Sequence, residues 1–551
     1  MTINKATYCA REIVQACISH GAQHVVIAPG SRNAPLSWAF AQAQKAGAIK
    51  VHIRIDERDA GFLALGIAKA TQQIVPVVVT SGSAVANLLP AVVEAFQSAV
   101  PLVVLSADRP AKFRGLSAPQ TIKQFEIFGS FAKVSIDVEP DLKDFANVEQ
   151  VLSAAKAMRP GPIQINVQFD VPLMPDTSEL DWSPELPAKN KTEVSNEKAK
   201  NLSRPELKVG TNGIFVIGDN ADPAAVKEIA KLAEQLAWPI IWEPSANAHS
   251  LTNSISHGVL LLQAGLAPQP EVVVTLGTVG LSRAVLTLLK NSPSHLAIHS
   301  LFSGPDLPNP VSSATQILDQ VPLLENTPDS NWLLQWQKLD SQASVVINMV
   351  LQQDTLSGPS SALALWNSSK DEDQIFVAAS WPVRHLEAYA PKRNGLTVFG
   401  NRGANGIDGL ISTAAGVAVG SGKRTYLLMG DIAFLHDLGG LNLGTDQGEP
   451  DLTIVVLDNN GSGIFSQLEQ GASEYQEHYE KIFGTPHGKD LWVIAESLGI
   501  PAKQVSTVTD LKFALTNFQN ISGIKVVVCL TGNRVDENNL IKQIIKETSK
   551  S

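Results

Sequence analysis

Short apolar runs alternate with alanine-rich amphipathic stretches along the first third of the chain. The apolar runs are rich in β-branched residues and end at glycine, proline or aspartate, which is typical of buried strands. The stretches between them, such as residues 61–72 and 83–99, have the spacing of helices. This alternation predicts a parallel α/β sheet. The expected strands are residues 24–30, 51–56, 75–82, 101–108 and 162–168.

The same alternation begins again twice further along the chain, after polar stretches that lack apolar periodicity. We therefore predict an α/β fold of three doubly wound, Rossmann-like parallel-sheet domains. The domains are residues 1–178, 209–330 and 355–551, with linkers at 179–208 and 331–354. The later strands are expected at 213–220, 239–244, 272–278, 294–300, 374–380, 396–403, 424–431, 452–461 and 525–532. One short echo, "IAPGSRNAPL" and "VFGNRGANGI", is weak evidence of duplication.

Composition narrows the class of protein. A chain of 551 residues is too long for a single core,. A net charge of -10 argues against nucleic acid or an anionic membrane as a partner,. No apolar run is long enough to cross a bilayer and no signal peptide is visible, so we expect a cytoplasmic protein without membrane insertion. The three cysteines are too scattered for a disulfide framework or a thiolate metal site,.

Oxygen-bearing side chains follow two of the expected strands in the last third of the chain. Asp431 comes directly after one strand, and Asn459 in "LDNNG" follows the next. Ligands of open α/β sheets lie at the carboxyl ends of strands. Asp431, the Asn459 amide and the Gly461 carbonyl would form half of a magnesium shell, which phosphate oxygens could complete. We find no phosphate loop and no dinucleotide-binding glycine motif,.

Arginines lie on glycine-rich or proline-containing turns in several of these segments. The planar guanidinium suits bidentate recognition of carboxylate and phosphate. Each arginine alone could be a surface ion pair, but five in an acidic protein favour a polyanionic substrate. They are Arg32, Arg109, Arg283, Arg384 and Arg402. No side-chain nucleophile is evident, and His385 and His436 are expected to be structural, so a cofactor is expected to carry the chemistry.

Glu57 lies where an apolar strand ends and a helix of small residues begins, in "RIDERDAGFLALGIAKA". Residue patterns leave three roles open for this carboxylate. It could be a solvated turn residue, an ion-pair partner, or a proton donor to a bound group.

Several segments together resemble the thiamine diphosphate-dependent enzymes. The resemblance rests on Gly-Asp at 430–431, followed about 28 residues later by Asn-Asn, and on Asp-Glu-Arg at 56–58. Within that group, the chain resembles the family of 2-succinyl-5-enolpyruvyl-6-hydroxy-3-cyclohexene-1-carboxylate synthases of menaquinone or phylloquinone biosynthesis. The matching segments span nearly the whole chain: "IAPGSRNAPL", "IDERDAGFLALGIAKA", "VVVTSGSAVANLLPAVVEA", "SADRP", "NRGANGIDGLISTAAG" and "GDIAFLHDLGGL".

The resemblance implies a pyrimidine-binding first domain, a central domain and a diphosphate-binding third domain. It implies thiamine diphosphate with Mg2+, or Mn2+ as an alternative, in a homodimer or dimer of dimers. Each active site would combine the first domain of one subunit with the third domain of its partner. The implied reaction is decarboxylation of 2-oxoglutarate and 1,4-addition of the succinyl carbanion equivalent to isochorismate, a second dicarboxylate.

The resemblance also assigns residues. Glu57 would contact N1′ of the aminopyrimidine and begin the proton relay that ends at C2 of the thiazolium. Asp431, Asn459 and the Gly461 carbonyl would hold the metal, and Ile407 would wedge the cofactor into its bent form. Further cofactor contacts would be Ser380, Ile464 and Phe465. Substrate contacts would be Ser31, Arg32, Arg109, Gln120, Arg283, Ser380, Arg384, Arg402, Phe465 and Leu468.

Two departures from the family pattern and two rival functions remain. The sequence reads Asp458-Asn459-Asn460, so the metal ligand is Asn459 or Asn460 depending on register, and the glycine two residues on favours Asn459. Pro119 precedes Gln120 where we expect a polar residue.

The rival functions are another thiamine diphosphate carboligase, such as an acetolactate synthase-like enzyme, and a non-catalytic metabolite-binding regulator.

Overall fold

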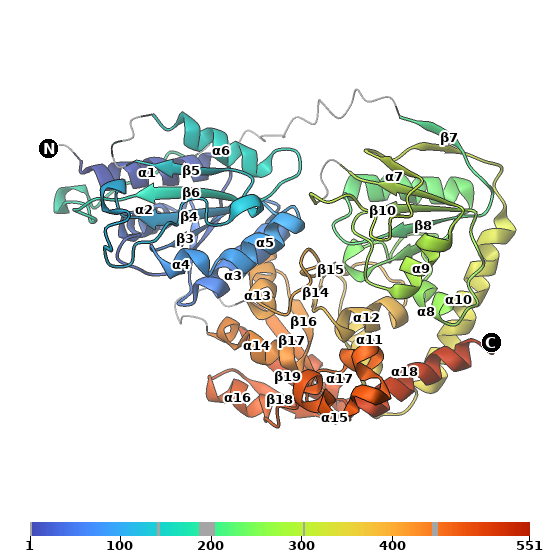
Figure 1. Cartoon of the computed structure of the whole chain (residues 1–551). Helices are drawn as coiled ribbons and strands as arrows, with labels where there is room; N and C mark the ends of the chain where they lie inside the picture. The colour runs from blue at the N-terminus through green and yellow to red at the C-terminus, as the bar shows by residue number, and fades with distance from the viewer. Residues whose placement is uncertain (1–2, 140, 142–143, 187–203, 301–303, 443–449) are drawn as a thin grey trace. The chain divides into compact units, whose positions relative to one another are not determined.

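Three larger sheets, all parallel, carry the fold in the computed structural model (Figure 1). The structure describes residues 3–139, 141, 144–186, 204–300, 304–442 and 450–551. Most of the linker predicted at 179–208 lies outside these residues. The prediction of a parallel α/β chain is confirmed. None of the helices in the described part of the chain has both the length and the apolar character needed to cross a bilayer.

The first sheet has the strand order β2-β1-β3-β4-β6-β5. Its central strands are wholly buried, which explains their unbroken apolar sequence,. The strands are β1 (His24–Ile27), β2 (Lys50–Ile53), β3 (Val75–Val79), β4 (Leu102–Asp108), β5 (Ser135–Val138) and β6 (Ile163–Gln168). The helices are α1 (Lys5–Ser19), α2 (Ala34–Lys45), α3 (Glu57–Thr71), α4 (Ser83–Ala86), α5 (Leu89–Gln97) and α6 (Ala146–Lys156).

The second sheet has five strands in the order β12-β11-β10-β8-β9. The strands are β8 (Gly213–Ile217), β9 (Ile240–Trp242), β10 (Val272–Leu276), β11 (Ser294–Ile298) and β12 (Gln316–Leu318); a two-stranded sheet pairs β7 (Glu206–Lys208) with β13 (Leu323–Glu325). The helices are α7 (Pro223–Leu236), α8 (Gly258–Gln263), α9 (Arg283–Asn291) and α10 (Ser330–Val350). Helix α10 occupies most of the linker predicted at 331–354.

The third sheet, β15-β14-β16-β17-β19-β18, has the same topology as the first. The strands are β14 (Gln374–Val377), β15 (Thr397–Phe399), β16 (Thr425–Gly430), β17 (Leu452–Asp458), β18 (Ala502–Val505) and β19 (Ile524–Leu530). The helices are α11 (Gly358–Ser368), α12 (Trp381–Tyr389), α13 (Leu410–Ser421), α14 (Asp431–His436), α15 (Gln476–Tyr479), α16 (Leu491–Ser497), α17 (Val508–Phe518) and α18 (Arg534–Thr548). The echoed motifs follow β1 and β15. These strands hold different positions in the two sheets, because β15 corresponds to β2. The evidence for an internal repeat is therefore the shared strand order and not the motif.

Two compact units group the chain differently from the three sheets. Unit 1 comprises Met1–Lys198, Gly403–Gly422 and Asp437–Asp451, and unit 2 comprises Ala199–Arg402, Lys423–His436 and Leu452–Ser551. Helix α13 therefore belongs to unit 1, although its flanking strands belong to unit 2. The domain boundaries drawn from the sequence stay predictions.

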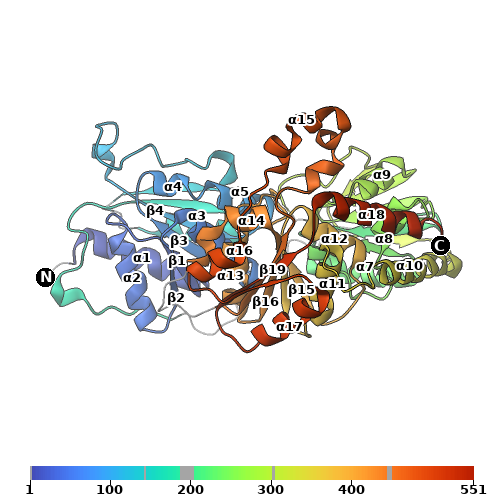
Figure 2. The same cartoon turned by 90° about the horizontal axis from the view of Figure 1, so that it is seen from below.

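Within unit 1, α13 packs closely on α3 (Figures 1 and 2). Glycines permit this contact: a Cβ on Gly66 of α3 would overlap the backbone of Thr413 and Gly416 in α13. The small residues of α3 noted in the sequence thus face another helix backbone. The two helices follow equivalent strands, β2 and β15, of their sheets.

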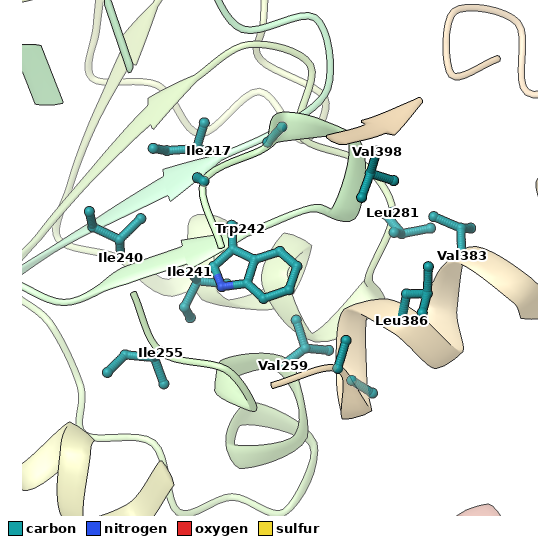
Figure 3. Close-up of a cluster of buried hydrophobic side chains, with 14 of the residues drawn as sticks. Ile217, Ile240, Ile241, Trp242, Ile255, Val259, Leu281, Val383, Leu386 and Val398 are labelled. Carbon is teal, nitrogen blue, oxygen red and sulfur yellow. The ribbon is translucent and has the colours of Figure 1, made fainter. Parts of the chain in front are cut away.

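Within unit 2, a continuous apolar core joins the second and third sheets. Trp242 at the end of β9 belongs to this core, as do Val383 and Leu386 of α12 (Figure 3). Leu281, in the turn before α9, packs into the same cluster. This core sets the position of α12, which carries Arg384, relative to the turn before α9.

Candidate active site

Asp431 lies at the carboxyl end of β16, beside the end of β17. The two strands pair in register through Gly430 and Leu457, so the residues that follow them are neighbours. One carboxylate oxygen of Asp431, Oδ2, accepts from the backbone N–H of Asn459 at 3.3 Å and of Gly461 at 2.7 Å. The other, Oδ1, accepts from Ile432 N–H at 2.6 Å. The structure thus brings together the three residues predicted to hold a metal.

Asn459 fits a metal site better than Asn460. The Asn459 amide donates from Nδ2 to Glu537 Oε2 at 3.1 Å. Its buried Oδ1 has no hydrogen-bond partner among the described residues. Asn460 is exposed, and its Oδ1 accepts from Gly488 N–H at 2.8 Å. A carboxylate and a buried amide oxygen that receives no hydrogen bond provide the oxygen ligands that Mg2+ prefers. The residues present therefore fit the metal.

His487 joins this site from a loop that the sequence did not single out. Its Nε2 lies 3.3 Å from Asp431 Oδ2 and 3.4 Å from Asp458 Oδ1. The candidate ligand atoms of Asp431, Asp458 and His487 all lie within 4.8 Å of one another. Burial raises the pKa of Asp431 to about 6; N–H groups from Gly461 and Ile432 lower it, Asp458 raises it and His487 lowers it. The only sequence signal was a histidine between proline and glycine in "GTPHGK".

Glu537 of α18 connects the site to α12. Its Oε1 lies 3.1 Å from Nε2 of His385, whose ring stacks on Trp381. Burial opposes ionisation of Glu537, but hydrogen bonds from His385 and Asn459 outweigh it and lower its pKa. The structural role expected for His385 agrees with these contacts, whereas Glu537 carried no signal in the sequence.

Three of the five predicted arginines lie near one another in unit 2. Arg384 donates to Ser380 O at 2.8 Å and to Leu281 O at 3.3 Å. Burial lowers the pKa of Arg384, the charges of Glu387 and Glu243 raise it, and those of Arg402 and Arg283 lower it. Arg402 is only 8% exposed, and its Nε has no hydrogen-bond partner in the described part of the chain. A buried guanidinium N–H without an acceptor is suited to an anionic ligand.

Two buried acids that the sequence did not single out accompany these arginines. Glu243 accepts from the backbone N–H of Gly280 at 2.8 Å and of Leu281 at 2.9 Å, and so fixes the turn whose carbonyl binds Arg384. Burial raises the pKa of Glu243, and that of Glu387 well above its usual range, although Arg402 opposes both shifts.

In unit 1, Glu57 is the first residue of α3, and its Oε2 accepts from Asn87 Nδ2 at 3.3 Å. Asp56 caps this helix by accepting from the N–H groups of Arg58 and Asp59,. Glu57 is a half-buried residue at the N-terminus of the helix, where the positive end of the helix dipole lies,. Of the three open roles, its place at a helix start beside an amide donor favours an oriented functional carboxylate over a solvated turn residue.

The other two predicted arginines, Arg32 and Arg109, belong to unit 1 and lie close enough to interact. Arg32 donates to Phe169 O at 3.0 Å, and Arg109 donates to Pro119 O at 3.0 Å. Burial lowers the pKa of Arg32, and the charge of Arg109 lowers it further. Pro119, the unexpected residue, thus supplies a backbone acceptor to Arg109. The neighbouring Gln120 donates from Nε2 to Ser81 O at 3.0 Å.

The other predicted residues lie in turns and in one short 3-10 helix. Ser380 precedes α12 with φ 72°, a strained conformation for a residue other than glycine, of the kind that gathers at functional sites,. Ser31 is exposed in the turn after β1, and Ile407 is half-buried in the turn before α13. Ile464 and Phe465 lie in the 3-10 helix η7 (Ile464–Gln467), which ends just before Leu468.

Sequence comparisons agree with this geometry. Residues 8–127 match the N-terminal TPP binding domain of thiamine pyrophosphate enzymes, and residues 379–529 match their C-terminal TPP binding domain. The chain is 37% identical, over 93% of its length and 94% of the relative, to a 2-succinyl-5-enolpyruvyl-6-hydroxy-3-cyclohexene-1-carboxylate synthase of Thermobifida fusca (strain YX). A protein of the same name from Nocardioides sp. (strain ATCC BAA-499 / JS614) is 37% identical over 98% of both chains.

A third relative of that name, from Paenarthrobacter aurescens (strain TC1), is 38% identical over 92% of this chain and 91% of its own. All three relatives have the same name, and each matches this chain over nearly its whole length. The chain therefore belongs to the 2-succinyl-5-enolpyruvyl-6-hydroxy-3-cyclohexene-1-carboxylate synthase family of thiamine diphosphate-dependent enzymes.

Proposed function

We propose that the chain decarboxylates 2-oxoglutarate and adds the resulting succinyl unit to isochorismate, with thiamine diphosphate and Mg2+. The products would be 2-succinyl-5-enolpyruvyl-6-hydroxy-3-cyclohexene-1-carboxylate and CO2, in menaquinone or phylloquinone biosynthesis. The names of the relatives support this reaction. The observation that carries it is that unit 2 holds both a metal-type cluster at Asp431 and the arginines Arg283, Arg384 and Arg402.

Each group of residues has a defined task in this proposal. Asp431, Asn459 and the Gly461 carbonyl hold Mg2+, which anchors the diphosphate. When bound, thiamine diphosphate supplies the electron sink for breaking and making the carbon–carbon bonds. Glu57, oriented by Asn87, holds a proton at N1′ of the aminopyrimidine,. Ile407, Ile464 and Phe465 pack against the cofactor.

The arginines bind the carboxylates of the two substrates. Arg402 offers a buried N–H that no described residue accepts, and two backbone carbonyls hold the guanidinium of Arg384 in place. Arg32, Arg109 and Gln120 provide a second polar group in unit 1, with Ser31 beside them. Ser380, Phe465 and Leu468 complete the substrate contacts of unit 2.

We further propose a homodimer or dimer of dimers in which each active site combines a pyrimidine-binding domain with the partner subunit's diphosphate-binding domain. The boundaries 1–178, 209–330 and 355–551 describe these domains. Mn2+ as an alternative metal and the cytoplasm as location belong to the same proposal.

An assay with both substrates tests the reaction. We expect loss of isochorismate absorbance only when 2-oxoglutarate, thiamine diphosphate and Mg2+ are all present. Arg402→Ala removes a charged hydrogen bond to substrate and should raise the KM by about ten- to a hundredfold. Arg204→Ala, in an exposed ion pair with Glu228, is the matched control and should leave the KM unchanged,. Turnover of pyruvate alone would instead support an acetolactate synthase-like enzyme.

A further inference from the structure

Two buried carboxyl groups of unit 1 face each other beside the proposed catalytic residue. Asp59, in the first turn of α3, is 1% exposed, and Asp437, just before the 3-10 helix η6 (Leu438–Leu441), is fully buried. Arg58 Nη2 lies 3.8 Å from Asp59 Oδ1 and 3.6 Å from Asp437 Oδ1. These two Oδ1 atoms have no hydrogen-bond donor among the described residues.

A shared proton resolves this arrangement. Burial raises the pKa of Asp59, and a hydrogen bond with the side chain of Asp437 lowers it. Two ionised carboxylates cannot form that bond, because neither carries a donor. If one group is protonated, it donates to the other, and the pair carries a single negative charge that Arg58 can balance. Burial, and then the charge of Asp59, raises the pKa of Asp437 to about 7.

The pair lies where three elements meet. Asp437 Oδ2 accepts from the N–H of Ser412 at 3.0 Å and from its Oγ at 3.3 Å, in the first turn of α13. Glycines in η6 allow the close approach. A Cβ on Gly439 would overlap Asp59 Oδ2, and one on Gly440 would meet Ser412 Oγ at 2.7 Å. The start of α3 and the start of α13 are therefore joined through η6.

We propose that Asp59 and Asp437 are a positioning pair, whose shared proton fixes the first turn of α3, and with it Glu57, against the first turn of α13. This inference rests on the proposed function, because the pair acts through Glu57. The other charged groups that face the pair are Arg54, Arg58 and Asp56. The two arginines favour ionisation of Asp59, and Asp56 opposes it.

The shared proton makes stability depend on pH in a defined direction. The folded pair holds its proton up to about pH 7, whereas an unfolded aspartate loses its proton near pH 4. Between these values the folded state binds more protons, so stability falls as pH rises. Asp437→Asn keeps a donor for Asp59 and does not titrate. The folding equilibrium constant of Asp437→Asn, divided by that of the native chain, should rise by up to about tenfold per pH unit between about pH 4 and pH 7. Above pH 7 this ratio should stay constant.

This first measurement uses urea unfolding of the cofactor-free protein and does not depend on activity. Asp59→Asn should behave like Asp437→Asn, because either amide supplies the missing donor. Asp329→Asn is the matched control: it makes the same change at the N-cap of α10, in unit 2, and asparagine caps a helix as well as aspartate does,. Its pH profile should follow that of the native chain. Identical profiles for all four proteins, or loss of folding in both Asp59→Asn and Asp437→Asn at pH 6, overturn the shared proton.

The second measurement tests positioning of Glu57, through exchange of the C2 proton of bound thiamine diphosphate followed by NMR. At pH 6 the native chain and Asp437→Asn should exchange equally. At pH 9 the native pair is doubly ionised and exchange should slow several-fold, while Asp437→Asn keeps its rate. Equal slowing in both overturns the positioning role even if the first measurement succeeds. Absence of cofactor binding contradicts the proposed function instead, and the unfolding profiles still decide the shared proton.

Discussion

At the scale of single residues, the two asparagines after β17 have opposite surroundings. Asn459 has a buried amide oxygen that receives no hydrogen bond from the described residues, whereas the amide oxygen of the exposed Asn460 accepts one from Gly488. We expect Asn459→Ala to weaken Mg2+-dependent binding of thiamine diphosphate by at least about tenfold, the cost of losing even an outer partner of a metal ligand. Asn460→Ala, the matched control, should bind within about twofold of the native chain. Titration calorimetry checks both, and the reverse order would make Asn460 the ligand.

The position of a site residue in the chain decides whether the sequence could predict it. Asp431 and Asn459 come at the ends of strongly apolar strands, and strand ends of a parallel sheet converge. His487 and Glu537 reach the same place from a loop and from the start of α18. Their approach depends on tertiary packing of the whole segment after β17. No local pattern encodes that packing, so these two residues were missed.

The acids among the arginines illustrate a second limit. Glu243 lies near the end of the strand expected at 239–244, and Glu387 lies in a segment for which no element was predicted; a charged residue is ordinarily exposed,. Their burial arises because the second and third sheets share one core around Trp242 and Leu386. A fold-level contact between segments over 100 residues apart therefore gives these carboxyl groups their raised pKa values.

At the scale of elements, the strands that the sequence missed in the three larger sheets are edge strands. β5, β12 and β18 each close one side of a sheet. They are short and partly exposed, so polar residues interrupt their apolar pattern. The central strands are buried on both faces and read as continuous apolar runs, which is why they were predicted. The short strands β7 and β13, with exposed ends, were missed for the same reason.

The contact between α3 and α13 gives a prediction at this scale. Gly66→Ala places a methyl group on the backbone of Thr413 and Gly416, which cannot move without displacing the whole helix. We expect it to destabilise the protein by about 1–3 kcal/mol, the usual cost of overpacking. Gly280→Ala is the control, since a Cβ there would meet no atom of the described residues within 4 Å. Urea unfolding measures both, and equal stability of the two variants would exclude a tight helix contact.

At the scale of the whole molecule, cofactor binding should stabilise the folded chain by mass action. In the proposed function, thiamine diphosphate and Mg2+ bind only the native state, so at a hundred times the Kd they should add about 2.7 kcal/mol to the free energy of unfolding. A thermal-shift titration should show a rise in Tm that requires both components. Asp431→Ala should remove the rise, because the proposed metal site loses its buried carboxylate. A full shift in that variant would place the metal elsewhere.

The first and third sheets share one strand order, and the helices that follow their second strands pack on each other. Repeated topology was visible in the sequence only as three series of strands, because the short motif echo falls after different strands of the two sheets. The shared order becomes evident once the edge strands β5 and β18 are placed. The sequence was thus sufficient for the fold class and insufficient for the internal repeat.

The division of the chain into two units constrains how it can be cut. Proceeding from residue 1, the polypeptide enters unit 1 three times and unit 2 three times, in turn. A fragment that stops before residue 403 lacks α13 and η6, and leaves the glycine face of α3 open to water. The complementary fragment carries α13 without the helix it packs on. No single proteolytic cut or gene truncation can release either unit whole, because each unit consists of three separate segments of the chain. The two units therefore have to be expressed together as one polypeptide.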